Sequence, residues 1–371
     1  MSATANRTID RRTFMRLSAS AALMALLGGS LTGCGSSGKS GTSSAGSGDA
    51  ADLSGITLGM LNYEGWIGEN EVDAFQDQTG CIVKQYATPD GGDSAWVNKI
   101  SKGAGTYDFT LAGIKVATTL HDNDLLADFD ASKVPNIANI PQKFLDAYPY
   151  GIPVEQGKVG FIYDKDKLPN PPKTWAELFA NSSQYSGKLV FPNFDTDVID
   201  AALMSLGLDI NTDNVDDIEK AKNAVIEIKG DIKAFLDSGG AAAVADGSAL
   251  ICIGYDYEYA ATAPDADNLA WLVPEEGTFG YLDGWVPLKD SENLDAVYEF
   301  MNFHLDQDNY VDFINTTAAS WLMEDIAGDL DEGIGDCEAL DPDKSEVTYQ
   351  KSVSKEITKK ISSAFQEIKN A

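Results

Sequence analysis

Short apolar runs alternate along this chain with amphipathic helical patterns. The apolar runs predict buried strands over 56–61, 81–86, 108–112, 189–191, 250–254, 269–273 and 284–288. Between them, apolar residues recur at three- and four-residue spacing, as in the helix predicted from Leu294 through Met301 to Leu305. Strand–helix alternation of this kind is typical of a mostly parallel sheet covered by helices on both faces. The pattern therefore predicts an α/β protein.

Local chemistry marks several helix boundaries. Thr174 and Glu177 have the spacing of a capping box, which predicts a helix start at Trp175. A helix over 198–206 is expected to open just after Asp195 and Asp197. One apolar stripe predicts a helix that ends at Gly239 and contains Ala221, Val225, Ile228, Ile232 and Phe235. The tail predicts an amphipathic helix with Ile357, Ile361, Phe365 and Ile368 on its apolar face.

The first 34 residues have the pattern of an export signal. Two adjacent arginines, Arg11 and Arg12, precede an apolar stretch, 17–31, that is too short to span a bilayer. It ends in Leu-Thr-Gly-Cys34, so the segment resembles a twin-arginine signal joined to a lipoprotein processing site. We expect a signal peptide at 1–33 and lipidation of Cys34. A Gly/Ser-rich tether, 34–52, then leads to the folded part, whose length favours two lobes.

The net charge of the mature chain limits the kinds of partner that it is expected to bind. The signal contains all four arginines and Asp10, and without them the 27 basic and 58 acidic residues become 23 lysines and 57 acids, a net charge of −34. Such acidity argues against nucleic acid and anionic membranes as partners. With no arginine, the mature chain also lacks the bidentate clamp for carboxylates and phosphates. A cationic ligand is the easier electrostatic fit.

The chain offers few residues for metal binding or nucleophilic catalysis. Cys81, Cys252 and Cys337 show no C-x-x-C spacing and are expected to be buried, with one disulfide possible. The two histidines are far apart, and His304 falls in an apolar helical pattern that predicts a packed residue. No zinc site, Ser-His-Asp triad, G-x-S-x-G, H-E-x-x-H or phosphate loop is indicated. We therefore expect a binding protein without a cofactor, and not an enzyme.

Motifs along the chain resemble the spermidine/putrescine-binding proteins of ABC importers. They are Asn62-Tyr63 with Trp66, Tyr107-Asp108, Tyr150-Gly151-Ile152-Pro153, Thr174 to Leu178, and Glu276 to Asp283. The resemblance covers 53 to about 330 and implies the type II periplasmic binding protein fold, two α/β lobes with central mixed sheets joined by a hinge. We expect lobe 1 at 53–152 plus about 283–318, and lobe 2 at 153–282 plus about 319–371. It also implies a monomer, lipid-anchored outside the cytoplasmic membrane, that delivers a solute to permease subunits.

A polyamine requires carboxylates for its ammonium groups and aromatic faces along its methylenes. The resemblance implies that Tyr63 and Trp66 form an aromatic pair after the first strand, and that Tyr281 and Asp283 form an aromatic-x-Asp that follows a late glycine-containing turn. It further implies a carboxylate near a helix start. The candidate ligand-binding residues are Tyr63, Trp66, Asp195, Asp197, Tyr255, Asp256, Tyr281 and Asp283.

The chain departs from the family pattern after the third strand, where Gly113 and Lys115 replace a small hydroxyl and an aromatic. A lysine in the pocket wall repels a diamine unless it points away. A late tyrosine of the family is replaced by Ala318 or Ala319. Other receptors therefore stay open as alternatives, namely a ferric-ion receptor using the tyrosines of 255–259 and a sugar receptor. Two other classes also stay open, a secreted hydrolase that uses two carboxylates and a surface protein that binds a host or cell-wall partner.

Overall fold

A computed structural model describes residues 51–89 and 92–371. The chain divides into two units, Met1–Ala50 and Ala51–Ala371, and the second is described here by itself. The predicted signal peptide, the lipidation site Cys34 and all but the last two residues of the predicted tether lie outside the described residues. In the part of the chain that is described, no helix combines the length and apolar character needed to cross a membrane.

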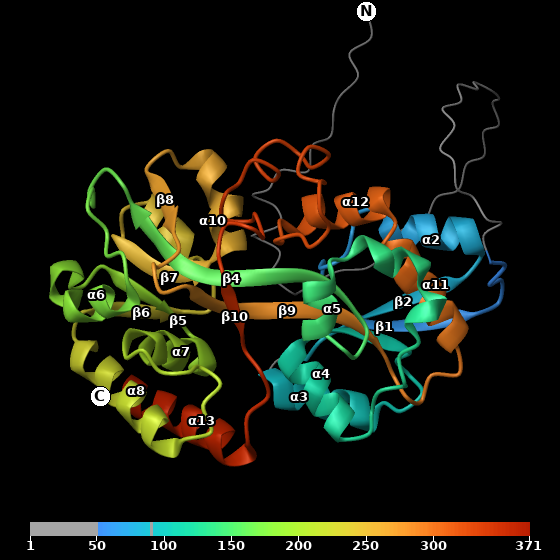
Figure 1. Ribbon diagram of the computed structural model, residues 1–371, viewed down its shortest axis with the longest axis horizontal. Helices are drawn as coiled ribbons and strands as arrows, with labels where there is room; N and C mark the ends of the chain where they lie inside the picture. The colour runs from blue at the N-terminus through green and yellow to red at the C-terminus, as the bar shows by residue number, and fades with distance from the viewer. Residues whose placement is uncertain (1–50, 90–91) are drawn as a thin grey trace, which may run out of the picture. The chain divides into compact units, whose positions relative to one another are not determined.

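Strands and helices alternate through the described unit, as the apolar pattern predicts (Figure 1). The strands are β1 Thr57–Asn62, β2 Ile82–Ala87, β3 Phe109–Gly113, β4 Ile152–Asp164, β5 Leu189–Pro192, β6 Ile232–Leu236, β7 Ile251–Tyr255, β8 Leu269–Leu272, β9 Thr278–Pro287 and β10 Val347–Tyr349. The helices are α2 Glu71–Thr79, α3 Gly92–Lys102, α4 Ile114–Asp122, α5 Gln142–Ala147, α6 Trp175–Ala180, α7 Asp195–Ser205, α8 Val215–Ile228, α9 Gly240–Ala245, α10 Asp256–Thr262, α11 Leu294–His304, α12 Gln307–Thr317 and α13 Lys355–Asn370.

The described strands form one mixed sheet in the order β2-β1-β3-β9-β4-β7-β5-β6, with β10 paired to β9 and β8 paired to β4. The outer pairs, β1 with β2 and β5 with β6, are parallel. The central strands β3, β9, β4 and β7 pair antiparallel. The predicted α/β class with mixed sheets is confirmed. The antiparallel pairing at the centre of the sheet places residues that are distant in sequence directly opposite one another.

Two long strands, β4 and β9, connect two hydrophobic cores. The first core gathers β1, β3, α11, α12 and the segment 319–340, and the second gathers β5, α7, α8 and α13. β4 contributes Val154 to the first core and Phe161 to the second. β9 contributes Trp285 to the first and Phe279 to the second. The predicted lobe boundaries stay a prediction, but each core has its own set of strands and helices, and both long strands run between them (Figure 1).

Several local predictions are confirmed. Thr174 caps α6, with its Oγ1 accepting the Glu177 N–H at 2.9 Å. The tail helix α13 buries Ile357, Ile361, Phe365 and Ile368 and packs against α7 and α8 (Figure 1). Each such side chain stabilises the fold by about 1.5–3 kcal/mol relative to exposure. His304 is fully buried, with its Nδ1 2.7 Å from Glu71 Oε1.

Other predictions differ in part from the structure. The helical stripe through Ile232 and Phe235 is wrong, because α8 ends at Ile228 and these two residues belong to β6. The helix predicted after Asp195 and Asp197 starts at Asp195, so both acids lie in its first turn. Tyr281 and Asp283 follow a turn at 274–277, as predicted, and lie within β9. Cys81 and Cys252 are buried as predicted, Cys337 is half-buried, and all three are free cysteines.

Candidate ligand-binding site

Trp66 is positioned by the loop that follows β1. The buried Asn62 side chain shapes this loop, since its Nδ2 donates to the Trp66 carbonyl at 2.6 Å and its Oδ1 accepts the Tyr63 N–H at 2.7 Å. Gly65, with φ of 73°, supplies the left-handed turn between them. The indole N–H of Trp66 then donates to Glu155 Oε1 on β4. The loop thereby places an aromatic ring beside a buried carboxylate.

Three central strands align Gly113, Asp283 and Glu155. Asp283 on β9 is directly opposite Gly113 of β3 and Glu155 of β4. Directly opposed residues of antiparallel strands point to the same face. A Cβ added at Gly113 would lie 3.1 Å from Asp283 Oδ1, so the glycine leaves room for this carboxylate. The sheet thus places two carboxylates side by side on one face.

Both carboxylates are buried. Glu155 is fully buried and Asp283 is 5% exposed. Glu155 Oε2 finds no hydrogen-bond partner within 51–89 and 92–371. Burial, followed by the nearby Asp283 carboxylate, raises the pKa of Glu155 well above its ordinary value. A buried carboxylate with an unsatisfied oxygen and a like-charged neighbour is stabilised by a proton or by a cation.

Aromatic rings continue along the same face of the sheet. Gly157, two residues beyond Glu155, is opposite Tyr281. The Tyr281 ring lies over this glycine, where any Cβ would collide with it. Tyr255 stacks on Tyr257, with centroids 5.3 Å apart, and meets Tyr281 edge-on at 6.4 Å. Trp66 meets Tyr257 edge-on at 5.8 Å. These four rings form a continuous aromatic group next to the two carboxylates.

A second pair of buried carboxylates lies beyond Tyr255, in the first turns of α7. The Tyr255 hydroxyl donates to Asp197 Oδ2. Gln350 donates through Nε2 to Asp197 Oδ1 at 2.9 Å and to Asp200 Oδ2 at 2.7 Å. Asp197 is 6% exposed and Asp200 is 1% exposed, and burial raises the pKa of both carboxyls. The aromatic group therefore has a carboxylate pair at each end.

Three further predicted residues, Asp256, Asp195 and Tyr63, make other contacts. The Asp256 carboxylate accepts the Lys158 N–H at 3.1 Å, the Tyr257 N–H at 2.9 Å and the Ser320 hydroxyl at 2.7 Å. Burial raises its pKa to about 6. Asp195 accepts the Ser362 hydroxyl of α13 at 2.6 Å. Tyr63 is 41% exposed and packs edge-on against Trp96 at 5.0 Å.

The structure brings together Trp66, Asp197, Tyr255, Tyr281 and Asp283 of the predicted set. It adds residues that the sequence analysis missed, namely Glu155, Tyr257, Asp200 and Gln350. Glu155 had a signal, since it follows the quoted motif Tyr150 to Pro153 and is a charged residue inside an apolar strand. Tyr257 was inside the noted Tyr255–Tyr259 alternation. Gln350 had none, because it joins the site only through the fold.

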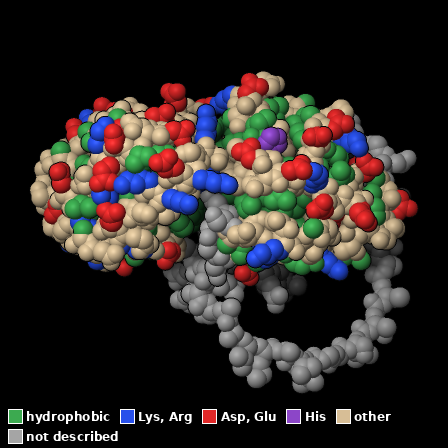
Figure 2. Space-filling model, turned by 90° about the horizontal axis from the view of Figure 1, so that it is seen from below, with side chains coloured by type: hydrophobic (Ala, Val, Ile, Leu, Met, Phe, Trp, Pro, Cys, Tyr) green, Lys and Arg blue, Asp and Glu red, His purple; other side chains and the backbone are tan. Residues whose placement is uncertain are grey.

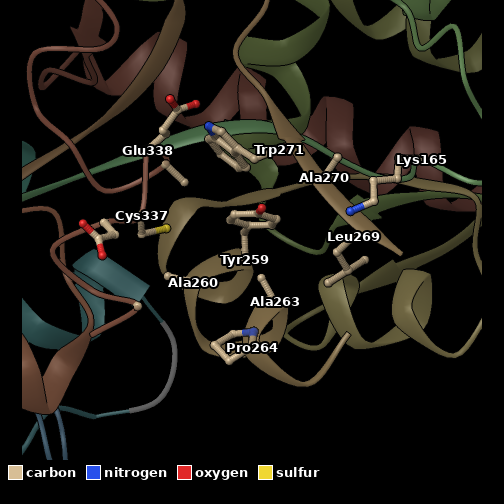
Figure 3. Close-up of a pocket in the computed structure, with 13 residues that line it drawn as sticks. Lys165, Tyr259, Ala260, Ala263, Pro264, Leu269, Ala270, Trp271, Cys337 and Glu338 are labelled. Atoms are coloured by element: carbon tan, nitrogen blue, oxygen red, sulfur yellow. The ribbon is translucent and has the colours of Figure 1, made fainter. Parts of the chain in front are cut away.

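A cavity of about 450 Å³ lies elsewhere, between α10, β8 and the segment 333–339. Figure 3 shows Tyr259 and Trp271 facing one another there, with Cys337 beside them. The Trp271 ring lies over Gly160, where an added Cβ would be 2.6 Å from Cη2. Gly160 and Gly157 are three residues apart in β4, so Trp271 and Tyr281 lie on opposite faces of the strand. None of the predicted site residues lines this cavity.

Residues 71–321 match the family model described as bacterial extracellular solute-binding protein. The match spans more than half of the chain, and the chain belongs to this family. The expectation of a binding protein, as against an enzyme, agrees with membership in a family of solute-binding proteins. Extracytoplasmic location likewise agrees with the extracellular family description, while lipid anchoring rests on residues outside those described.

Individual proteins resemble the chain over most of its length. The putrescine-binding periplasmic protein SpuD of Pseudomonas aeruginosa is 25% identical over 318 residues, covering 78% of this chain and 86% of SpuD. Among solved structures, the spermidine/putrescine substrate-binding protein PotD of Streptococcus pneumoniae superposes with a TM-score of 0.74 at 23% identity, covering 85% and 99% of the two chains. The Tp0655 (TpPotD) lipoprotein of Treponema pallidum gives 0.73 at 23%, covering 84% and 99%. These similarities confirm the type II periplasmic binding protein fold.

Proposed function

We propose that this protein is the extracytoplasmic receptor of an ABC importer and captures a polyamine. One ammonium group binds between Glu155 and Asp283, and the other end of the ligand lies toward Asp197. The rings of Trp66, Tyr255, Tyr257 and Tyr281 lie along the methylene chain and add cation–π attraction. The protein acts as a monomer and passes the ligand to permease subunits.

The observation that carries this proposal is the buried, directly opposed carboxylate pair Glu155 and Asp283. Lys158, on the same strand as Glu155, points to the other side of β4, where its Nζ donates to the Asp341 carbonyl at 2.6 Å. A ligand ammonium supplies a positive charge for the pair and a donor for Glu155 Oε2. The printed names of SpuD and of the other putrescine-binding relatives support the same ligand class.

Acidic side chains are also spread over the protein surface, among lysines (Figure 2). This surface favours the approach of a cation at low ionic strength. The two cores, joined by β4 and β9, suit a receptor whose lobes close over the ligand about these strands. The predicted lipid on Cys34 keeps the receptor beside its permease, and replacing Cys34 with Ser should release the protein from the membrane fraction.

The experiment that tests the ligand class is a thermal-shift panel on the purified protein. The panel contains putrescine, spermidine, agmatine, simple sugars and ferric citrate. A ligand at 100 times its Kd stabilises the folded state by about 2.7 kcal/mol, which raises the midpoint measurably. We expect a shift with the amines only, and a smaller shift at high salt because the contacts are charge-assisted. A shift with a sugar or ferric citrate and none with the amines contradicts the proposal.

A further inference from the structure

Lys115 connects the two halves of the described unit beside the second carboxylate pair. It lies in the first turn of α4, two residues after Gly113, and its half-buried side chain extends to α7. There its Nζ donates to Thr196 Oγ1 at 3.3 Å. α4 packs into the first hydrophobic core and α7 into the second. The sequence neighbour of Thr196 is Asp197, so this ammonium is brought to the Asp197 end of the site.

The charge of Lys115 acts on both buried acids of α7. Its positive charge lowers the pKa values of Asp197 and Asp200, against the larger effect of burial, which raises them. At the opposite end of the site, the neighbouring charge with the largest effect on Glu155 is another carboxylate, Asp283. The two ends therefore differ in the charge that acts on their buried acids, a lysine ammonium for Asp197 and Asp200 and a carboxylate for Glu155.

We propose that Lys115 takes the place of a second ligand ammonium beside Asp197, so that the site recognises one ammonium strongly and a second one weakly. The inference rests on the proposed function and refines its ligand class. Amines with a single ammonium and an alkyl tail should bind nearly as well as diamines of the same length. Lys115 is then a specificity-determining residue that reduces the advantage of the second charge.

The physical reason is like-charge repulsion. A diamine that places its far ammonium near Asp197 must approach Lys115, and two unit charges a few ångströms apart interact by several kcal/mol at the effective dielectric of a partly buried site. Removing that repulsion also leaves Asp197 and Asp200 without their nearest basic side chain. Both effects favour the second ligand ammonium and leave a ligand with one ammonium unaffected.

The test compares putrescine with n-butylamine, which has the same carbon chain and one ammonium. Calorimetric Kd values are measured for the unaltered protein, for Lys115→Gln and for Lys115→Met. The glutamine keeps a donor for Thr196 without the charge, so it separates electrostatics from the tie between α4 and α7. Lys165→Met, at an exposed lysine lining the cavity of Figure 3, is the matched control for loss of one positive charge.

We expect both Lys115 variants to bind putrescine about tenfold or more tightly than the unaltered protein, with n-butylamine affinity changed less than about threefold. Lys165→Met should leave the ratio of the two affinities unchanged. Equal gains for both amines, no gain, or a loss of putrescine binding in Lys115→Gln overturns the inference, and the proposed function stands as long as the unaltered protein binds putrescine. If neither the unaltered protein nor any variant binds either amine, both the inference and the proposed function are contradicted.

Discussion

Glu155 on β4 and Asp283 on β9 lie directly opposite each other on one face of the sheet, and both carboxylates are buried. They are 128 positions apart in the sequence and meet because the two strands pair antiparallel. A pair of buried acids with one unsatisfied oxygen costs stability in the ligand-free protein. In the proposed function, the same pair binds one ammonium group of the ligand.

Glu155→Gln should stabilise the ligand-free protein while it weakens ligand binding. The amide removes the charge beside Asp283 and keeps an oxygen for the Trp66 N–H. We expect the free energy of unfolding to rise by about 1–3 kcal/mol at pH 8, measured by urea titration. Glu324→Gln, at an exposed glutamate, should change it by less than about 0.5 kcal/mol. A less stable ligand-free Glu155→Gln protein would mean that the carboxylate contributes favourably to the fold.

Ligand binding should release protons. The pKa of Glu155 is raised by burial and by Asp283, so the folded chain holds this proton more tightly than the unfolded chain. Its contribution to stability is complete below the ordinary value of 4.5 and is lost as the pH rises through the raised folded pKa. An ammonium binds the ionised carboxylate, so affinity should increase with pH through the same range.

Calorimetry in two buffers of different ionisation enthalpy measures this proton release directly. Burial also raises the pKa of Asp256, to about 6, so the comparison with Glu155→Gln is needed to isolate the contribution of Glu155. We expect proton release in the unaltered protein and a smaller release in Glu155→Gln. Identical proton release in the two proteins would show that Glu155 is already ionised before the ligand binds.

Gly157→Ala should weaken amine binding by displacing the Tyr281 ring. A methyl group at Gly157 collides with the Tyr281 ring, which must leave the face of β4. We expect a loss of about 1–3 kcal/mol in unfolding free energy and weaker amine binding. Gly230→Ala is the control, because a Cβ there meets no atom within 4 Å in the described structure. Unchanged amine affinity in Gly157→Ala would argue that Tyr281 does not contact the ligand.

Tyr255→Phe should destabilise the ligand-free protein. The phenol donates to Asp197, which is 6% exposed, and its loss leaves a buried carboxylate oxygen without this donor. The expected cost is about 1–3 kcal/mol in unfolding free energy, measured by urea titration. Tyr163→Phe, at a half-buried tyrosine of β4, is the control. Equal stability of the two variants would contradict a stabilising role for the Tyr255–Asp197 contact.

The sequence was sufficient for those parts of the fold that local pattern determines. The capping box at Thr174 and the apolar stripe of α13 each depend on residues within a few positions, and both are confirmed. The stripe through Ile232 and Phe235 misled because three-residue spacing also occurs by chance where a helix gives way to a strand. The pairing of β6 with β5 decides the outcome there, and that pairing is not a local property.

The site residues likewise include some that local motifs reveal and others that only the tertiary structure reveals. Asp283 and Tyr281 were found through a motif, whereas Glu155 becomes meaningful only through the register of β4 against β9. Asp256 was also a candidate in the sequence, but its carboxylate is already hydrogen-bonded to Lys158, Tyr257 and Ser320. Among the 57 acids of the mature chain, only the tertiary structure reveals which ones lie buried on a common face.

The most direct test of the central claim is a calorimetric titration of putrescine into the unaltered protein and into Asp283→Asn. Asp195→Asn is the control, because that carboxylate accepts from Ser362 on α13. We expect saturable one-to-one binding that is weakened about 30-fold or more in Asp283→Asn and is nearly unchanged in Asp195→Asn. No binding at millimolar putrescine, or equal affinity in the unaltered protein and Asp283→Asn, would contradict it.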